Sequence, residues 1–336
     1  MPTLNPIVDR LGRALCDLRI SVIDGCNYRC TYCMPEGHTP RSRSTARKRL
    51  SIPQIVNLAQ GFAQAGTRKI RLTGGEPLLR KDLADLVHEV HRLPGIEEVA
   101  LTTNGSLLRG QALALRQAGL SRITISLDAA DPIRFTEITG GGDLEDVLGA
   151  IDAAERVGFS SIKINCVLKK GVNDDQIVPL INRFRGTSHV LRFIEFMDVG
   201  NCNAWKNEQV VPSSQVLATI RRIAPLERIP PTSAGEVATR YAFVDGTGEV
   251  GLISSITEPF CGNCNRARIS SIGDLYTCLF ATEGVSLSAE ADQGPGAVEQ
   301  RIRQIWSQRR DRYSELRTVL PSIPTGKRIE MYMIGG

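Results

Sequence analysis

The 336-residue sequence has few aromatic residues and no long apolar run. Phe, Trp and Tyr make up 5% of the chain, and no stretch alternates them with basic residues as a platform for single-stranded nucleic acid would. No segment approaches the roughly 18 consecutive apolar residues that indicate a membrane span, and the first residues lack the apolar stretch of a secretion signal. We therefore expect a cytoplasmic protein with neither nucleic acid nor a membrane as a partner.

Disulfides are not expected either, although the chain has nine cysteines. The number is odd and the chain shows no secretion signal, so we expect a reducing compartment, where grouped cysteines more often bind metal or do chemistry. Six of the nine fall into two groups, which are Cys26, Cys30 and Cys33, and Cys261, Cys264 and Cys278. The others, Cys16, Cys166 and Cys202, are interpreted as buried thiols.

Each group offers three thiolates, and this number distinguishes between kinds of metal site. A structural zinc site is closed by four protein ligands. A 4Fe–4S cluster is held by cysteine thiolates, and with only three of them one iron is left free to bind a small molecule. We predict two such clusters, and hence a redox enzyme. The alternative left open is a non-enzymatic electron carrier or scaffold that holds zinc or an iron–sulfur cluster. Zinc as the sole metal in the protein would argue against the radical enzyme and favour this alternative.

Over the first 200 residues, β-rich runs alternate with amphipathic helical stretches. The expected strands are 14–22, 69–73, 99–103, 123–127, 161–167 and 190–196, and the expected helices are 53–65, 81–92, 107–117, 144–157 and 175–185. Strict alternation predicts a parallel sheet with right-handed crossovers. Six units are too few for a closed eight-stranded barrel. We therefore predict an α/β fold with an open, partial β/α barrel of six units.

The pattern changes after Pro225. Segments 240–244 and 249–254 predict a hairpin, and the second cysteine group follows it. Apolar residues at helical spacing predict a helix over 298–316 whose stripe packs on a core, with Val298, Ile302, Ile305, Trp306 and Tyr313 as its members. We predict two domains: a barrel over residues 1–225, and a smaller C-terminal domain over residues 226–336 that covers the barrel mouth.

Glycines and polar residues follow the expected strands at the edge where β/α barrels place their chemistry. The second strand ends in Gly74-Gly75-Glu76-Pro77, where the absence of Cβ atoms lets the backbone approach a ligand. Four basic residues fall within the expected strands, namely Lys69, Arg71, Lys163 and Arg192. Long, positively charged side chains are rarely buried without a partner. Together with Arg266 and Arg268, they predict a cavity for an oligophosphate.

These features resemble the radical S-adenosylmethionine superfamily and, within it, the GTP 3′,8-cyclases of molybdenum-cofactor biosynthesis. The C-x3-C-x2-C loop and the Gly-Gly-Glu-Pro turn are typical of the superfamily. The closer resemblance rests on segments that span nearly the whole chain, namely 18–26, 33–35, 72–77, 193–200, 259–268, 275–280 and the terminal Gly335-Gly336. One departure is Gly25, where the family usually has arginine, but it changes no cluster ligand.

The resemblance implies roles residue by residue. The first cluster would be held by Cys26, Cys30 and Cys33, and the S-adenosylmethionine on its open iron would also contact Tyr32, Gly75, Ser126 and Met197. The second cluster would be held by Cys261, Cys264 and Cys278, and its open iron would meet the guanine base. GTP would be bound by Arg19, Lys69, Arg71, Thr102, Lys163, Arg192, Arg266, Ala267 and Arg268, of which Lys69 and Arg192 are added from their places in the barrel.

The implied activity is a radical cyclisation of GTP. An electron donor reduces the first cluster, S-adenosylmethionine is cleaved to methionine and a 5′-deoxyadenosyl radical, and that radical takes hydrogen from C3′ of GTP before C3′ attacks C8. Cyclic pyranopterin monophosphate synthase, as the next enzyme, and a second copy of the chain are the further partners considered. The rival is a peptide-modifying radical enzyme with an auxiliary cluster, and consumption of GTP or of peptide would discriminate between them.

The end of the chain forms a separate hypothesis. Apolar Met331, Met333 and Ile334 could anchor it, and two terminal glycines have no side chain to obstruct a narrow channel. We predict that this tail enters the barrel and that Gly335 and Gly336 act in catalysis. The alternative is a frayed chain end without consequence.

Overall fold

One curved sheet carries all the residues predicted to bind GTP. The computed structural model describes residues 6–34, 48–233, 235–317 and 328–335. Within them the sheet has twelve strands in the order β12-β11-β10-β1-β2-β3-β4-β5-β6-β9-β8-β7. The strands are β1 (Asp17–Ser21), β2 (Lys69–Thr73), β3 (Glu98–Thr103), β4 (Arg122–Ser126), β5 (Lys163–Leu168), β6 (Val190–Glu195), β7 (Leu226–Ile229), β8 (Thr239–Phe243), β9 (Glu249–Ile253), β10 (Arg266–Ile269), β11 (Asp274–Tyr276) and β12 (Val285–Ser286).

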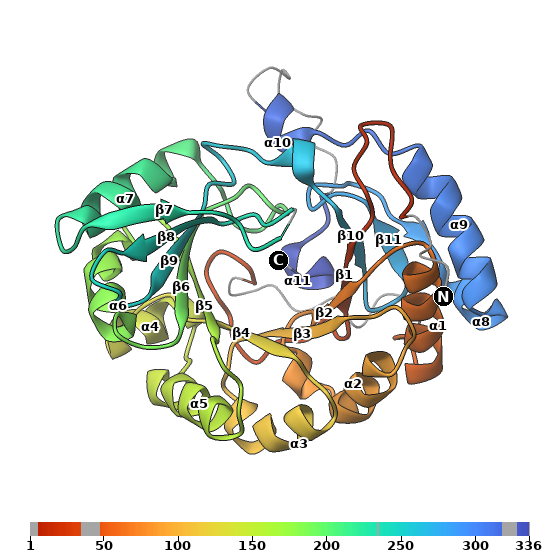
Figure 1. Cartoon of the computed structure of the whole chain (residues 1–336), viewed down its shortest axis with the longest axis horizontal. Coiled ribbons are helices and arrows are strands. Elements are labelled where there is room, and N and C mark those ends of the chain that lie inside the picture. Colours follow the sequence, from red (N-terminus) through yellow and green to blue (C-terminus); the bar gives the residue numbers. More distant parts are fainter. Residues whose placement is uncertain (1–5, 35–47, 234, 318–327, 336) are drawn as a thin grey trace.

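Most helices cover the outer face of the curved sheet, whereas α11 lies inside the curve (Figure 1). The helices are α1 (Ile52–Gln64), α2 (Leu83–His91), α3 (Ala112–Gln117), α4 (Pro132–Thr139), α5 (Leu144–Arg156), α6 (Ile177–Phe184), α7 (Ser213–Arg221), α8 (Ser288–Gln293), α9 (Pro295–Ser307), α10 (Tyr313–Leu316) and α11 (Met331–Ile334). Among the residues that the structure describes, none of these helices is long and apolar enough to cross a bilayer.

The first six strands form the parallel barrel wall that the sequence predicts. Strands β1 to β6 run parallel, each beside the next, and helices connect them. The sheet stays open, because β12 and β7 are at its opposite ends. The open α/β barrel of six units is therefore confirmed, with α4 as an additional helix that the sequence analysis did not predict.

Helix α5 illustrates why these segments fold as expected. The Asp143 side chain precedes it and accepts a hydrogen bond from the Glu145 N–H at 2.9 Å, which satisfies a free donor of the first turn. Its buried residues recur every three to four positions and pack on the barrel core; they include Leu144, Val147, Leu148, Ile151 and Ala154. Gly158 follows the helix with φ of 87°, a left-handed conformation that ends it at little steric cost.

The register of the sheet places arginines side by side. Arg19 of β1 is in register with Arg71 of β2 and with Arg268 of β10. Residues directly opposite each other on neighbouring strands point to the same face of a sheet. The pairing of β1 with both neighbours thus creates a row of three guanidinium groups from segments far apart in the sequence.

The C-terminal part extends the barrel wall at both edges. Strand β9 pairs parallel with β6, and β10 pairs parallel with β1. The predicted hairpin is confirmed as the antiparallel pair β8 and β9, but its place at the edge of the barrel was not predicted. A division of the chain after residue 225 stays a prediction.

The predicted helix over 298–316 is wrong in its second half. Helix α9 ends at Ser307 and the chain turns before the short α10. Val298, Ile302 and Trp306 are buried as expected, but Tyr313 is not part of their stripe. Its ring stacks on Phe280 with centroids 4.5 Å apart, and other interactions of the turn, described below, direct the chain toward the second cysteine group.

The carboxylate of Glu195 joins the barrel to the segment beyond β9. It is buried at the end of β6, and its Oε1 accepts hydrogen bonds from the N–H (2.8 Å) and hydroxyl (2.9 Å) of Ser213, where α7 begins. Its Oε2 accepts bonds from the N–H groups of Ile256 (2.8 Å) and Thr257 (2.9 Å). One buried anion therefore fixes three elements around the barrel mouth.

Candidate active site

The first cysteine group lies in the loop after β1. The N–H of Cys33 donates to the carbonyl of Cys30 at 3.0 Å, which makes the loop turn back on itself. The Cys26 sulfur accepts a hydrogen bond from the N–H of Tyr28 at 3.4 Å and from Asn104 Nδ2 at 3.9 Å. Donors aimed at a cysteine sulfur suit a thiolate that binds iron.

Burial raises the pKa of Cys26, Cys30 and Cys33. With their pKa raised, these thiols would stay protonated at neutral pH without a bound cation. A metal ligand is the thiolate, so binding a cluster would displace the protons. Among the described residues, no three His, Cys, Asp or Glu side chains converge on a point suited to a single metal ion. Thiolates that bind different irons of one cluster do not need to converge in this way.

The residues predicted to contact S-adenosylmethionine lie at the ends of four elements around this loop. Tyr32 donates its hydroxyl to Asp128 Oδ2 at 2.6 Å. A Cβ at Gly75 would collide with the backbone of Gly25, so this position accepts only glycine. Ser126 is the last residue of β4, and Met197 follows β6 and lines the cavity that is described below with the second cysteine group.

Glu76 is a framework residue that the sequence analysis quoted but did not assign to the site. Its buried carboxylate accepts hydrogen bonds from the Thr103 hydroxyl (2.7 Å), the Asn104 N–H (2.7 Å) and the Leu78 N–H (3.0 Å). Burial raises its pKa to about 7. Glu76 thereby ties the end of β2 to the end of β3 and holds Asn104 beside Cys26.

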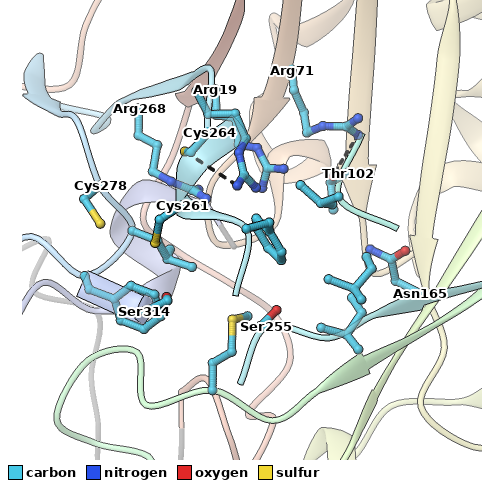
Figure 2. Close-up of a pocket in the computed structure, with 18 of the residues that line it drawn as sticks. Arg19, Arg71, Thr102, Asn165, Ser255, Cys261, Cys264, Arg268, Cys278 and Ser314 are labelled. Atoms are coloured by element: carbon cyan, nitrogen blue, oxygen red, sulfur yellow. Dashed lines mark hydrogen bonds between the residues drawn. The ribbon is translucent and has the colours of Figure 1, made fainter. Parts of the chain in front are cut away.

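The second cysteine group faces the interior of the barrel. Cys261, Cys264 and Cys278 line one side of a cavity in the barrel, the central cavity, and Figure 2 shows them opposite Arg71 and Thr102. Burial alone would raise the pKa of Cys264, but the neighbouring Arg266 and Arg309 lower it to about 6. Burial raises the pKa of Cys278 to about 11. At neutral pH Cys264 is therefore a thiolate that can bind a metal cation.

Arginines supply all the positively charged side chains among the described residues that line this cavity. Five line it, namely Arg19, Arg71, Arg192, Arg266 and Arg268, and no carboxylate is among the described residues around it. Arg71 Nη1 donates to the hydroxyls of Thr102 (3.1 Å) and Thr124 (3.2 Å), which fixes its direction. Buried cations without counter-ions are costly, so this wall is suited to a polyanionic ligand.

The remaining predicted cations line an adjoining cavity toward the first residues of the strands. Lys69 and Lys163 line it together with Arg122, and the central cavity shares Arg19, Arg71, Arg192 and Arg266 with it. Burial and the neighbouring Arg192 lower the pKa of Lys163 to about 8. Ala267 is the exception among the predicted GTP contacts, because its buried side chain belongs to the hydrophobic core and lines neither cavity.

The tail of the chain lies within the curve of the sheet (Figure 1). Tyr332 and Ile334 of α11 are buried, and Arg268 Nη1 donates to the carbonyls of Ile334 (3.4 Å) and Gly335. Gly335 has φ of 66°, and a Cβ there would collide with Thr73. Gly336 lies outside the described residues. The tail thus touches an arginine that lines the central cavity.

Asp198 anchors both segments that lead to the tail, a role that the sequence analysis missed. Its Oδ2 accepts a hydrogen bond from the Tyr313 hydroxyl at 2.6 Å and lies 3.3 Å from Arg328 Nη1, and its Oδ1 pairs with Arg317 at 2.7 Å. Asp198 is next to Met197 in the sequence, which was the one available signal. Its partners are more than 100 residues away, so no local pattern reveals them.

Cys202 is half-buried beside the first cysteine group, in contrast to the buried thiol that the sequence analysis predicted. Its sulfur donates to the Cys33 carbonyl at 3.4 Å and to Glu330 Oε2 at 2.9 Å. Glu330 also accepts a hydrogen bond from the Asn201 N–H at 3.1 Å. Glu330 therefore fixes the start of the tail beside the first cysteine loop. Cys166 is buried in β5 as predicted, whereas Cys16 is half-buried.

Comparison with known proteins agrees with this arrangement. The family model described as the Radical SAM superfamily matches residues 20–184, and the model described as Molybdenum Cofactor Synthesis C matches residues 189–315. A crystal structure of SuiB from Streptococcus suis bound to the precursor peptide SuiA has a similar fold, with a TM-score of 0.61 and 14% identity over 89% of this chain and 66% of SuiB. That likeness concerns the fold alone.

Similarity in sequence is much closer to one group of proteins. GTP 3′,8-cyclase of Xanthomonas axonopodis pv. citri is 52% identical over 333 residues, which cover 98% of this chain and 99% of that protein. GTP 3′,8-cyclase of Acidothermus cellulolyticus is 47% identical, with 94% and 89% covered. The Radical SAM family model identifies the chain as a radical S-adenosylmethionine protein. Within that class, the chain belongs to the GTP 3′,8-cyclase family.

Proposed function

We propose that this chain converts GTP to 3′,8-cyclo-7,8-dihydro-GTP, the first step of molybdenum-cofactor biosynthesis. The observation that supports this most is the central cavity, which brings three cysteines of the second group together with five arginines. Its wall offers an iron–sulfur site for one end of a nucleotide and cations for the other. Met197 also lines this cavity, and Arg268 of its wall donates a hydrogen bond to the carbonyl of Gly335 in the tail.

Two 4Fe–4S clusters and S-adenosylmethionine, when bound, supply the electron and radical chemistry that protein side chains lack. The chain itself holds and orients the nucleotide. Arg19, Arg71 and Arg192 line the cavity and would bind the phosphates, while the second cysteine group would hold the guanine end. Met197 lines the cavity and the tail contacts Arg268 of its wall, where both would help to exclude water and other hydrogen donors.

The proposal also requires partners. Reductive cleavage consumes an electron, so an electron donor must reach the first cluster. We propose the cytoplasm as the compartment, cyclic pyranopterin monophosphate synthase as a transient partner that receives the product, and a homodimer as the oligomeric state.

Anaerobic incubation with GTP, S-adenosylmethionine and a strong reductant tests the function. Mass spectrometry of the products is expected to show a cyclised nucleotide with the mass of GTP together with 5′-deoxyadenosine and methionine. Metal analysis of the protein purified without oxygen is expected to find iron. Zinc as the sole metal, or consumption of a peptide but not of GTP, would refute the proposal.

Replacing Arg71 or Lys163 with alanine is expected to weaken GTP binding. A charge-assisted hydrogen bond contributes about 1.5–3 kcal/mol, so the dissociation constant should rise roughly ten- to a hundred-fold for each change. Guanosine lacks phosphates, so its weaker binding should hardly respond. Calorimetric titration of both ligands gives the measurement, and Arg134→Ala on the outer helix α4 is the control, since it removes an exposed charge. Equal losses for GTP and guanosine would indicate damage to the fold.

The pH dependence of GTP binding provides a second test of Lys163. Its pKa of about 8 in the free protein should rise when phosphate stabilises the ammonium form. The binding free energy from this contact is therefore full below the free-protein pKa and declines as the pH rises through it. Between about pH 7 and 9 the affinity should fall more in the parent than in Lys163→Ala; parallel profiles would remove Lys163 from the phosphate site.

A further inference from the structure

A buried arginine outside both cavities reaches the second cysteine group. Arg309 lies in the turn between α9 and α10, and its side chain is 1% exposed. Its Nη2 donates to the Cys264 sulfur at 3.3 Å, and its Nη1 donates to the Cys264 carbonyl at 2.7 Å. One guanidinium group therefore binds both the sulfur and the backbone of the same predicted cluster ligand.

A buried network fixes this guanidinium group. Arg309 Nη1 lies 3.3 Å from Asp9 Oδ2, its Nε lies 3.1 Å from Asp311 Oδ2, and its Cζ lies 4.5 Å from the centre of the Trp306 ring. Asp9 also pairs with Arg13 at 2.6 Å, and Arg13 Nη1 donates to the carbonyl of another ligand residue, Cys261, at 2.8 Å. The geometry leaves Arg309 no alternative rotamer without loss of several contacts.

Arg309 differs in this respect from the other cation near the same sulfur. Arg266 Nη2 is 3.6 Å from the Cys264 sulfur, but Arg266 lines the central cavity, where a bound polyanion would compensate its charge. Arg309 is not among the described residues that line either cavity. Its ion pairs with Asp9 and Asp311 are part of the fold, so its effect on Cys264 is the same whether or not a nucleotide is bound.

We propose that Arg309 positions the second cluster and raises its reduction potential. Reduction adds negative charge to an iron–sulfur cluster, so a fixed cation and a hydrogen bond at a ligand sulfur stabilise the reduced form more than the oxidised form. The inference rests on the proposed function only in requiring a cluster at Cys261, Cys264 and Cys278. Arg309 is a positioning residue, since it is not among the described residues that line either cavity and would act through Cys264.

Reductive titration of the enzyme loaded with both clusters, followed by electron paramagnetic resonance, tests this role. The signal of the second cluster is assigned by its loss in Cys264→Ala. Arg309→Gln keeps an amide donor but removes the charge, and is expected to shift the midpoint potential of the second cluster to more negative values while leaving that of the first unchanged. Arg310→Gln is the matched control, because the adjacent Arg310 is exposed and the same charge is lost.

An Arg309→Gln enzyme with full iron content and the midpoint potential of the Arg310→Gln enzyme would overturn the inference. If Arg309→Gln fails to hold the second cluster, Arg309→Lys decides: it keeps a charge but loses the forked contact with Cys264, so a smaller shift in the same direction is expected, and no shift would refute the role. A parent enzyme that shows only the first cluster would refute the proposed function as well.

Discussion

Alanine at Cys30 is expected to abolish S-adenosylmethionine cleavage, whereas alanine at Cys264 should leave some cleavage and eliminate the cyclic product. The two cysteine groups are on different segments and contact different neighbours. Cys30 is in the loop that also holds Tyr32 against Asp128, and it is not among the described residues that line the central cavity. Cys264 lines the central cavity beside Arg266. Under the proposed function the first group serves to generate the radical and the second to place the guanine, so the two changes should separate cleavage from product formation.

Both products can be measured in one experiment. Chromatography of quenched anaerobic reactions gives 5′-deoxyadenosine and cyclised nucleotide from the same sample, and their ratio reports coupling. The iron content is the control, because each variant should lose one cluster and keep the other. Normal amounts of cyclised nucleotide from Cys264→Ala would contradict the role given to the second group, and cleavage by Cys30→Ala would contradict that of the first.

Local patterns in the sequence predicted the barrel wall, which the structure confirms, and the candidate site residues, whose roles stay predictions. Strand and helix periodicity depends on neighbours within a few residues, so β2 and α5 fall where the pattern places them. Cysteine spacing is also local, which is why both cysteine groups could be identified. In the structure the second cysteine group and the predicted arginines line the same cavity. The alternation of side chains along the strands had predicted that these arginines point into the barrel.

Long-range pairing could not be predicted in the same way. Nothing local in β9 or β10 shows that these strands add to opposite edges of the barrel wall. The turn that separates Tyr313 from α9 is stabilised by Arg309, whose partners Asp9 and Cys264 are 300 and 45 residues away. Ala267 was included by its place in a matching segment, but strand alternation turns it away from its neighbours Arg266 and Arg268 and into the core.

Removal of Gly335 and Gly336 is expected to suppress formation of the cyclised nucleotide while GTP binding and both clusters persist. The anchors of the tail precede the deletion: Glu330 is fixed near Cys202, and Tyr332 and Ile334 are buried. The deletion removes a segment whose first residue contacts Arg268 in the cavity wall. We expect the tail to act by occupying space near the reacting carbon, so that the radical meets C3′ and not solvent.

Deuterium at C3′ of GTP makes this prediction measurable, because productive hydrogen abstraction transfers the label to 5′-deoxyadenosine. The truncated enzyme should lose this transfer, and a free peptide with the sequence of the tail should restore part of it. Gly335→Ala keeps the length of the chain but places a Cβ against Thr73 at a positive φ, so it should also reduce transfer. Equal label transfer in the parent and truncated enzymes would show that the tail only fills the barrel mouth and takes no part in the reaction.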